Sequence, residues 1–583
     1  MRTLVRLLTF LRPYKWSVAV TAIAALALMG CTITLPYITR RIIDDVLNGQ
    51  QQDALLPLVI AVIVIGVIRT IFALMRRIMA GSVSLSVEFD LRGLVFAHLQ
   101  RLSFGYFDRM PVGQLMSRAT SDLQTVRFFL GYGLIFLFMH LFTLVFVTVV
   151  LMFINVPLTI LALLMGPALA LVAIRSSRRT HPVLVDVQQK EADVTQTAEE
   201  SIAGIRVVKA FGQEVAQADR FSVRAHAEFS RSMDAARLQS FYQSLMGFLP
   251  VLGVAVVIAV GGTMTINGEL TLGEFVQFYL YLALLTFPFR SIGMLIGNAQ
   301  RASASGQRVF EILDTEPEIQ EADPPVPLPA NGGGAVRIEG VTFGYDPDRP
   351  VLHGVTLDIP AGRVVAFIGA TGSGKSTITQ LIPRFYDPQH GRVTIDGVDV
   401  RDAPLDDVRR AVGMVGQEPF LFSDTVRANI AFGRPEATDA EVAEAARLAQ
   451  ADPFIRALPE GYDTVVGERG FTLSGGQRQR VAIARAFLVD PRVLVMDEAT
   501  ASVDASTERE ISEALRSVMR GRTTIIIAHR LSTISLAEEI VLVDGGRIAA
   551  RGTHEELYAS SSLYREIHDQ GLARPDELVS SDA

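Results

Sequence analysis

Six stretches of about 20 predominantly apolar residues fill the first half of the chain and constrain its fold more than any other feature. A helix of this length can cross the hydrocarbon core of a bilayer, where it must satisfy its own backbone polar groups. The sequence therefore predicts a membrane domain of six transmembrane helices, with a tight turn between the third and the fourth. The six spans lie at residues 17–36, 55–76, 130–153, 156–174, 245–266 and 272–296.

Arginine and lysine are distributed unevenly over the connections between these spans. The long connections 77–129 and 175–244 hold many of them, whereas the short connections after the third and fifth spans hold none. Because cytoplasmic connections carry an excess of basic residues, we expect the long connections and both termini to be cytoplasmic. Arg40 and Arg41 lie on the opposite side in this scheme, and we expect the acidic residues that follow them to neutralise them.

The two long connections contain few Gly or Pro clusters and have a helical pattern. We therefore expect the spanning helices to continue well beyond the membrane. Residues 107–113 are expected to break the first connection, with a short helix around 114–121 after the break. Residues 200–211 are the comparable point in the second connection.

Three polar residues, Arg69, His140 and Arg290, lie inside the predicted spans. Inserting an arginine at the centre of a span costs about 2.5–3.5 kcal/mol, so such residues usually face a cavity or a partner. They are candidates for contact with a substrate. Interhelical packing or snorkelling to the membrane surface explains them equally well.

The second half of the chain has the pattern of a water-soluble α/β domain. Residues 316–334 are rich in Pro, Gly and acidic residues, which predicts a linker. Beyond it, short apolar runs alternate with helical segments, as in a parallel sheet with crossover helices. We expect a transmembrane domain with cytoplasmic helical extensions at residues 1–312, a linker at 313–335 and a soluble α/β domain at 336–583.

Composition narrows the classes of partner. The net charge of −7 gives no reason to expect binding to nucleic acid. The single cysteine, Cys31, excludes an internal disulfide and a cysteine-based zinc site. Arginine greatly outnumbers lysine, which we attribute to the base composition of a bacterial genome.

Residues 369–376, Gly-Ala-Thr-Gly-Ser-Gly-Lys-Ser, match the spacing of a phosphate-binding loop. An apolar run that predicts a buried strand precedes them, and a predicted helix follows. The glycines let backbone N–H groups surround phosphate oxygens at a helix N-terminus, where the helix dipole favours anions. Lys375 would reach the β- and γ-phosphates, and the Ser376 hydroxyl would ligate Mg²⁺. The loop therefore predicts binding of ATP with Mg²⁺.

Two further segments complete a plausible ATPase site. A second predicted strand, 493–498, ends in Asp497, which would hold Mg²⁺ through water, and Glu498, which would orient or deprotonate the attacking water. Residues 473–477 form another glycine-rich start of a helix, and so a second anion site. Since one nucleotide does not need two such sites in one chain, we expect a two-fold dimer in which each chain closes on its partner's ATP.

With these motifs the chain resembles a half-transporter of the ATP-binding-cassette exporter family, of the multidrug and lipid-flippase type. The resemblance covers nearly the whole chain. Residues 473–477 are similar to the family's signature motif, and residues 466–470 to the X-loop that touches the intracellular coupling helices. The remaining matches are Gln417 in the Q-loop, Asp504 in the D-loop, His529 as the switch histidine and Tyr345 as the aromatic residue that stacks on adenine.

The resemblance implies a role for each matched residue. It assigns catalysis to Glu498, His529 and Gln417, and ATP binding to Tyr345, Gly369, Ala370, Thr371, Gly372, Ser373, Gly374, Lys375, Ser376 and Thr377. It assigns contact with the partner's ATP to Ser474, Gly475, Gly476, Gln477 and Asp504, and Mg²⁺ to Ser376, Gln417 and Asp497. It assigns coupling between cassette and membrane domain to Glu468, Gly113 and Arg206.

The resemblance also implies a fold and a function. The expected fold is an α-helical membrane domain of six spans followed by an α/β P-loop cassette. The expected function is ATP hydrolysis coupled to export or flipping of hydrophobic or amphipathic drugs or lipids across the bacterial plasma (inner) membrane. ATP and Mg²⁺ are the expected ligands and a second half-transporter the expected partner; an intact Glu498 favours a homodimer, and a heterodimer stays open.

Three other functions share parts of this pattern. An importer built on the exporter fold, for example for an iron-carrying ligand, has the same motifs. A nucleotide-gated channel or regulator uses the same scaffold, although intact catalytic residues argue against it. A soluble repair or translation ATPase shares the cassette but lacks the spans.

Overall fold

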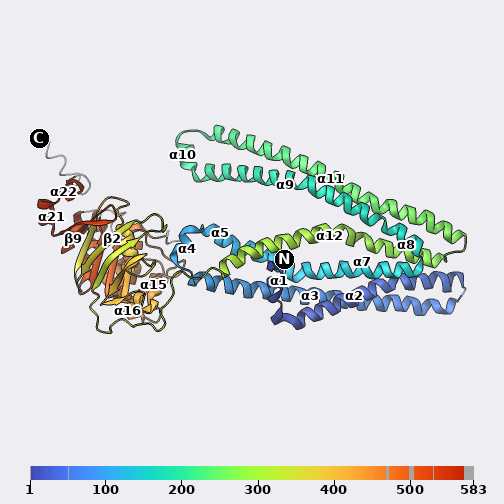
Figure 1. Cartoon of the computed structure of the whole chain (residues 1–583), viewed down its shortest axis with the longest axis horizontal. Coiled ribbons are helices and arrows are strands. Elements are labelled where there is room, and N and C mark those ends of the chain that lie inside the picture. The colour runs from blue at the N-terminus through green and yellow to red at the C-terminus, as the bar shows by residue number, and fades with distance from the viewer. Residues whose placement is uncertain are drawn as a thin grey trace. The chain divides into compact units, whose positions relative to one another are not determined.

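The chain folds into two compact units, drawn as ribbons in Figure 1. The computed structural model describes residues 2–49, 51–467, 470, 472–497, 505–528 and 531–569, and for residues 290, 292, 505–510, 531 and 532 it describes the backbone only. The first unit comprises Met1–Gln100 and Val112–Thr315, and the second comprises Arg101–Pro111 and Glu316–Ala583. A short segment between the second and third spans is thus grouped with the soluble part of the chain.

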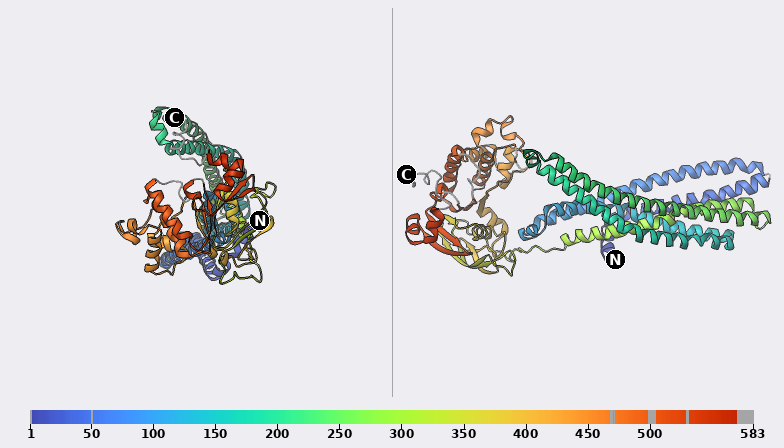
Figure 2. Two further views of the ribbon diagram at one scale, coloured as in Figure 1. Left: turned by 90° about the vertical axis from the view of Figure 1, so that its left-hand side faces the viewer. Right: turned by 90° about the horizontal axis from the view of Figure 1, so that it is seen from above.

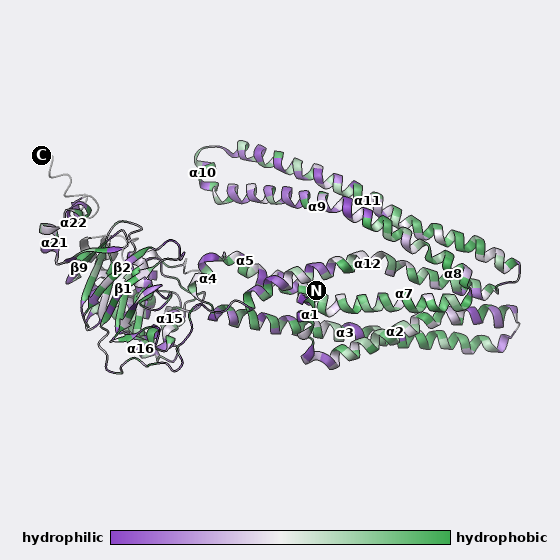
Figure 3. Ribbon diagram, in the orientation of Figure 1, coloured by the Kyte–Doolittle hydropathy of each residue, from purple (hydrophilic) through white to green (hydrophobic). Residues whose placement is uncertain are grey.

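Six long apolar helical stretches in the described part of the first unit confirm the predicted spans. They run for 37 to 53 residues. Since a helix of about 20 residues crosses a bilayer, these helices are long enough to extend beyond the membrane, as expected. Figure 3 shows α9 (Met165–Ala203) and α11 (Glu214–Ile266) changing from apolar near α8 to polar near α10. The stretches are Arg12–Asn48, Gln52–Arg101, Val112–Ile154, Val156–Ala203, Glu214–Ile266 and Leu272–Leu313.

The spans are assembled from the elements labelled in Figure 1. The short helix α1 (Arg2–Thr9) comes first, followed by α2 (Lys15–Arg41) with a π-helical turn at Ile42–Asn48, and by α3 (Leu55–Arg101). The third span contains α5 (Val112–Ser117), α6 (Leu123–Phe128) and α7 (Leu134–Ile154), with π-helical turns at Arg118–Asp122 and Phe129–Gly133. The others are α8 (Val156–Leu163) with α9, then α11, and α12 (Leu272–Leu313).

The connections between the spans are formed largely as predicted. Asn155 alone separates α7 from α8, and its Oδ1 accepts a hydrogen bond from the Leu158 N–H at 2.9 Å, which caps α8. The prediction of a break at 107–113 is too wide, because α4 (Phe104–Arg109) is helical. The connection is broken twice, at Leu102 and Ser103 before α4 and at Met110 after it. Met110 is extended because the following Pro111 disfavours helical geometry before it. The predicted helix at 114–121 accordingly begins at Val112.

The helices of the first unit pack in two ways. In Figures 1 and 2, α9 and α11 run side by side as an antiparallel pair joined through α10 (Ile205–Ala210). Helix α12 packs against both α2 and α7, with Phe278 and Tyr281 buried between the helices. The hydroxyl of Tyr281 donates to the carbonyl of Ile33 in α2 at 2.7 Å, so this buried polar group is satisfied.

A charged cluster joins the end of α2 to the start of α12. Arg40 Nη2 lies 2.9 Å from Glu274, and Arg40 Nε lies 3.5 Å from Asp44. The Asp44 carboxylate also accepts hydrogen bonds from Thr271 Oγ1 at 2.6 Å and the Gly273 N–H at 2.9 Å, at the N-terminus of α12. Together with the pair that Arg41 and Asp45 form at 3.0 Å, this confirms that each arginine pairs with the predicted aspartate, and it adds Glu274 as the closer partner of Arg40.

The soluble part of the second unit contains two sheets. Strands β1 (Val336–Phe343), β2 (Leu352–Ile359), β4 (His390–Ile395) and β5 (Val398–Asp399) form an antiparallel sheet in the order β2-β1-β4-β5. The second sheet has the order β10-β9-β3-β8-β7-β6, in which only β10 is antiparallel to its neighbour. Its strands are β3 (Val364–Ile368), β6 (Val412–Val415), β7 (Val493–Asp497), β8 (Thr523–Ile527), β9 (Glu539–Asp544) and β10 (Arg547–Gly552).

Both faces of the parallel sheet are covered. Val365 and Phe367 of β3 pack toward the antiparallel sheet, whereas Val364, Ala366 and Ile368 pack toward the helices. This explains why the strand is apolar throughout. The helices of the unit are α13 (Lys375–Leu381), α14 (Leu405–Ala411), α15 (Val426–Ile430), α16 (Asp439–Leu448), α17 (Asp452–Arg456), α18 (Gly475–Val489), α19 (Ala505–Met519), α20 (Leu531–Ile534), α21 (His554–Ser560) and α22 (Ser562–Ile567). Residues 316–334 form neither helix nor strand, as predicted.

Gly273→Ala is expected to lower the midpoint of thermal unfolding of the protein purified in detergent. The added methyl group would lie 2.5 Å from the Asp44 carboxylate and 2.7 Å from the Arg40 carbonyl oxygen, and overpacking typically costs about 1–3 kcal/mol. Gly262→Ala is the matched control, because Gly262 lies in α11 at the same end of the bundle and an added Cβ meets nothing within 4 Å. Equal midpoints for the two variants would contradict this packing.

Candidate functional site

The predicted phosphate loop connects β3 to α13, and its backbone needs glycine at three positions. Gly369 has φ +155°, and a Cβ there would lie 2.0 Å from the carbonyl oxygen of Val543 in β9. Gly372 has φ +82°, and Gly374, with φ +103°, is the N-cap of α13. The left-handed φ values and the close approach to Val543 are accessible to glycine without steric cost. The chain therefore turns sharply from the edge of the sheet into a helix N-terminus.

Lys375 lies across this loop. It is 5% exposed, and its Nζ donates to the carbonyl oxygens of Gly369 at 2.7 Å and Ala370 at 2.9 Å. Ser373 Oγ is buried and has no hydrogen-bond partner among the described residues. A buried hydroxyl of this kind costs free energy unless a ligand satisfies it, which fits a loop built to hold phosphate. Of the other loop residues, Ala370, Thr371 and Ser376 are exposed and Thr377 is buried.

Tyr345 extends from the segment after β1 toward α13. Its hydroxyl lies 2.8 Å from Gln380 Oε1 and 3.2 Å from Thr377 Oγ1, two positions just beyond the phosphate loop. The side chain is 50% exposed. An exposed aromatic ring beside the phosphate loop can stack on a nucleotide base.

The sequence interpretation missed Gln389, which positions Tyr345. The Gln389 side chain accepts a hydrogen bond from the Gly344 N–H at 2.9 Å and donates to the Gly344 carbonyl at 2.8 Å. An added Cβ at Gly344 would lie 2.4 Å from the Arg349 carbonyl oxygen, so the loop is closely packed here. A single glutamine 45 residues away in the sequence gives no signal from which this contact could be predicted.

The structure brings Asp497 to the same sheet edge as the phosphate loop. Asp497 ends β7, β8 lies between β7 and β3, and all three strands are parallel. Gln417, which is exposed, follows β6 at the next position along this edge. The carboxyl ends of parallel strands are where open α/β sheets bind their ligands. Glu498 and His529, which follow β7 and β8 in the chain, lie outside the described residues.

Ser474 starts α18 as its N-cap. Its Oγ accepts a hydrogen bond from the Gln477 N–H at 3.3 Å, and the Ser474 N–H donates to Gln477 Oε1 at 2.9 Å, which forms a capping box. Gly475 and Gly476 form the first turn. Within the described part of the chain, Ser474 and Gln477 bond to each other and not to the phosphate loop. Asp504 lies outside the described residues.

The remaining candidates are not gathered into one site. Gly113 is exposed in α5 and Arg206 is exposed in α10, while Glu468 lies outside the described residues. Arg69 is exposed on α3. His140 in α7 packs against Phe136 and Phe287, with ring centroids 6.3 and 5.2 Å apart. Arg290 is in α12, and its side chain is not described.

Comparison with known proteins identifies two matched regions of the chain. The family model for the ABC transporter transmembrane region matches residues 18–289, and the model for the ABC transporter matches residues 352–501. The chain is 38% identical to a multidrug efflux ATP-binding/permease protein of Mycobacterium bovis over 95% of its own length, but it spans only 46%, about half, of that relative. It is 36% identical to an ATP-dependent lipid A-core flippase of Syntrophus aciditrophicus, covering 97% of this chain and 93% of the relative. It also matches a solved structure of a bacterial Atm1-family ABC exporter with ATP bound, with a TM-score of 0.79, 31% identity, and coverage of 96% of this chain and 99% of that chain.

A phosphate loop on a parallel sheet, in one chain with six membrane-spanning helices, defines a multi-pass membrane protein of the P-loop nucleotide-binding class. The chain belongs to the ATP-binding-cassette transporter family and has the exporter architecture of a half-transporter. It carries the ATPase cassette of that family behind its transmembrane region.

Gln389→Ala is expected to weaken ATP binding about threefold to tenfold. It removes two hydrogen bonds to Gly344, and this loss of affinity corresponds to the about 0.5–1.5 kcal/mol that one such bond is worth. Binding can be measured by titrating the purified protein with a fluorescent ATP analogue. Lys375→Ala provides the reference for loss of phosphate binding. Unchanged affinity in the Gln389 variant would mean that Gly344 and Tyr345 are held by other contacts.

Proposed function

We propose that this chain is an ATP-driven exporter or flippase of hydrophobic and amphipathic compounds that works as a homodimer in a bacterial plasma membrane. The observation that carries the proposal is the shared edge of the parallel sheet, where the phosphate loop and Asp497 lie in a chain that also has six membrane-spanning helices. Binding energy from ATP is available at this edge. The function requires that this energy favour one arrangement of the helices over another.

The proposed reaction is hydrolysis of ATP on the phosphate loop. Residues 369–377 bind the triphosphate, and Tyr345 stacks on the adenine. Glu498 orients the attacking water and accepts its proton, and His529 donates a hydrogen bond to the γ-phosphate. Gln417 belongs to the same catalytic set and also ligates Mg²⁺.

Mg²⁺ fits the donors that the site offers. Ser376 presents an exposed hydroxyl in the first turn of α13, and Asp497 presents a carboxylate at the same sheet edge, with Gln417 next along that edge. In the described part of the chain no group of three or more His, Cys, Asp or Glu could hold a metal ion by itself. This agrees with an ion that is bound jointly with phosphate oxygens. When bound, it would neutralise charge on the phosphates.

The partner in the proposed assembly is a second copy of this chain. Residues 474–477 of one copy, with Asp504, would close on the ATP held by the other copy's phosphate loop. A helix N-terminus, whose first backbone N–H groups have no partner within the helix, favours a phosphate anion. The intact set of catalytic residues in the sequence supports two equal sites and hence a homodimer, although a heterodimer with a similar chain would have the same geometry.

We propose a transmembrane domain at residues 1–312, a linker at 313–335 and the ATP-binding cassette at 336–583, with both termini cytoplasmic. Coupling between the domains is assigned to Gly113, Arg206 and Glu468. Closure of two cassettes around ATP would shift the twelve helices of the dimer from an inward-open to an outward-open arrangement, and hydrolysis would release them.

The substrate class rests on the lining of the spans and on the relatives. The names of two relatives refer to multidrug efflux and to lipid A-core flipping, and both kinds of cargo are amphipathic. Arg69, His140 and Arg290 are the candidate polar contacts among otherwise apolar helices. An importer of an iron-carrying ligand or a nucleotide-gated channel remains the alternative.

Mixed dimers test whether each ATP site is shared between two chains. Lys375→Ala and Ser474→Ala chains are each expected to lose about 10²-fold or more of ATP hydrolysis alone, as removal of one preorganised phosphate donor typically does. When the two are co-produced with different tags and purified through both tags, each mixed dimer has one intact pair, Lys375 of one chain facing Ser474 of the other. Hydrolysis above that of both parents is expected. If each chain served its own ATP, no mixture would recover activity.

Transport is best measured on the chain alone in proteoliposomes and inside-out vesicles. Hydrophobic dyes or fluorescent lipids are expected to stimulate ATP hydrolysis and to accumulate in the vesicle lumen when ATP is added outside. Glu498→Gln is the inactive control, with ATP binding retained and turnover lowered about 10²–10⁴-fold. ATP-driven depletion of the lumen would favour import, and ion current without turnover would favour a channel.

A further inference from the structure

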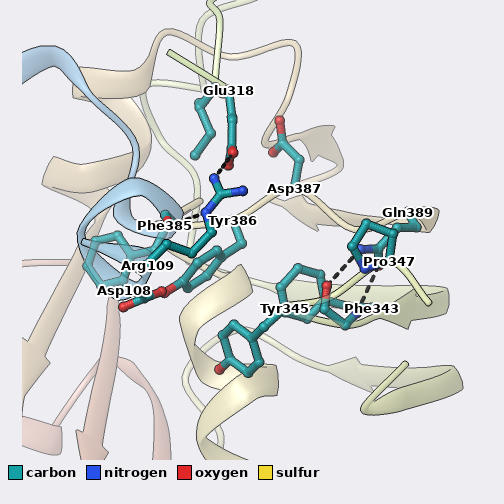
Figure 4. Close-up of a pocket in the computed structure, with 13 residues that line it drawn as sticks. Asp108, Arg109, Glu318, Phe343, Tyr345, Pro347, Phe385, Tyr386, Asp387 and Gln389 are labelled. Carbon is teal, nitrogen blue, oxygen red and sulfur yellow. Dashed lines mark hydrogen bonds and ion pairs between the residues drawn. The ribbon is translucent and has the colours of Figure 1, made fainter. Parts of the chain in front are cut away.

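A short helix from the membrane half of the sequence docks on the cassette beside Tyr345. Helix α4 belongs to the second unit, and the ring of Phe104 stacks on Phe385 with centroids 4.4 Å apart. Ser103 Oγ accepts a hydrogen bond from the Ile319 N–H at 3.0 Å, and Arg109 forms an ion pair with Glu318. Figure 4 shows Arg109, Glu318 and Phe385 among the side chains around one cavity.

Tyr386 lies between α4 and Tyr345. Its hydroxyl donates a hydrogen bond to the Asp108 carboxylate of α4. Its ring meets the ring of Tyr345 edge to face, with centroids 5.3 Å apart and planes at 89°. Burial, followed by the bond to Asp108, raises the pKa of Tyr386, so the phenol stays protonated and remains a donor at neutral pH. Figure 4 shows Tyr386 pointing toward Asp108, with Tyr345 beside it.

The backbone that carries Tyr386 is fixed to the phosphate-loop helix. The Phe385 N–H donates to the Gln380 carbonyl at 3.2 Å, at the end of α13. Arg384, which is 3% exposed, pairs with Asp387 at 2.9 Å. Tyr386 therefore has an anchored main chain, and the bond to Asp108 selects the direction of its side chain.

A cavity of about 330 Å³ adjoins both tyrosine rings. Its lining includes Tyr345, Tyr386, Asp108 and Gln389. Because this space is open, the ring of Tyr345 is not held by close packing on that side. The hydroxyl of Tyr345 is held by Gln380 and Thr377. Its ring makes edge-to-face contacts with Phe343 and Tyr386, and of these two rings only Tyr386 is bonded to α4.

We propose that Tyr386 is a positioning residue that links docking of α4 to ATP affinity: when its hydroxyl bonds Asp108, its ring holds Tyr345 in the orientation that stacks on adenine. The inference rests on the proposed role of Tyr345 as the adenine platform. It adds a connection within one chain between the segment joining the second and third spans and the base of the nucleotide. This connection is separate from the contacts assigned to Glu468, Gly113 and Arg206.

The coupling between docking of α4 and binding of ATP is reciprocal. If the bond between Asp108 and Tyr386 raises the affinity for ATP, bound ATP strengthens the docking of α4 by the same factor. Edge-to-face aromatic contact has a preferred geometry, so a change in the direction of the Tyr386 ring changes the surface that Tyr345 offers to a base. The bond between Asp108 and Tyr386 involves no residue of the phosphate loop at 369–376.

The test compares ATP with inorganic tripolyphosphate, which has no base, as competitors of a fluorescent ATP analogue on the purified full-length protein. Tyr386→Phe and Asp108→Ala are each expected to weaken ATP binding about fivefold, the lower end of typical allosteric couplings. The double variant is expected to match the single variants, because both changes remove the same bond. Tripolyphosphate binding is expected to stay within about twofold, since it makes no stacking contact.

Two controls separate this role from general damage. Arg109→Ala breaks the neighbouring exposed ion pair with Glu318 in the same helix and is expected to leave ATP affinity unchanged. In a Tyr345→Ala background, Tyr386→Phe is expected to have no further effect. Additive effects of the Asp108 and Tyr386 changes, an equal loss of tripolyphosphate binding, or no change in ATP affinity would each overturn the proposal. Wild-type protein that fails to bind ATP at all would instead overturn the proposed function.

Discussion

The close approach of the Gly369 backbone to the Val543 carbonyl is the contact on which the nucleotide site depends. It turns the chain directly over the neighbouring strand β9 and aims the following residues at a helix N-terminus. Lys375, bonded to the carbonyls of Gly369 and Ala370, holds the loop closed. A cradle that is already formed loses little conformational freedom when a triphosphate binds. The parallel strands β3, β8 and β7 end at the same sheet edge as this loop, and Tyr345 contacts the helix α13 that follows it.

Features encoded in a short stretch of sequence could be predicted, and features made by distant residues could not. The spans, the turn at Asn155, the absence of helix and strand in residues 316–334 and the phosphate loop each follow from local pattern. The break assigned to 107–113 was too wide because a pattern marks Pro111 without showing how short a helix fits before it. The separate antiparallel sheet was missed because alternating apolar runs do not reveal which strands pair. Gln389 and Tyr386 act through contacts 45 and 278 residues away in the sequence.

The charged residues of the first unit show the same contrast between local features, which the sequence predicts, and pairs of distant residues, which it does not. The distribution of arginine and lysine singles out Arg40 at the end of a span, but it does not show that Glu274, on the last span, pairs with it at 2.9 Å. Glu88, 6% exposed, pairs with Arg127 at 2.9 Å, which ties α3 to α6. Asp122, also 6% exposed, accepts from Arg308 Nε at 2.7 Å and ties the third span to α12. A buried charge without its partner is strongly destabilising, so these pairs fix which helices are neighbours.

The capping box at Ser474 leaves the start of α18 able to bind a second phosphate, in addition to the one that the phosphate loop can hold. In the box, Ser474 Oγ accepts a hydrogen bond from the Gln477 N–H. A serine hydroxyl has one hydrogen to donate besides its lone pairs, so the cap leaves that hydrogen available and fixes the oxygen at the helix N-terminus. A phosphate arriving from outside would meet an oriented donor and the positive end of α18 without any loss of the cap. Ser474 and Gln477 make no contact with the phosphate loop in the described part of this chain, so the cap and the phosphate loop are two separate places at which this chain offers a helix N-terminus to an anion.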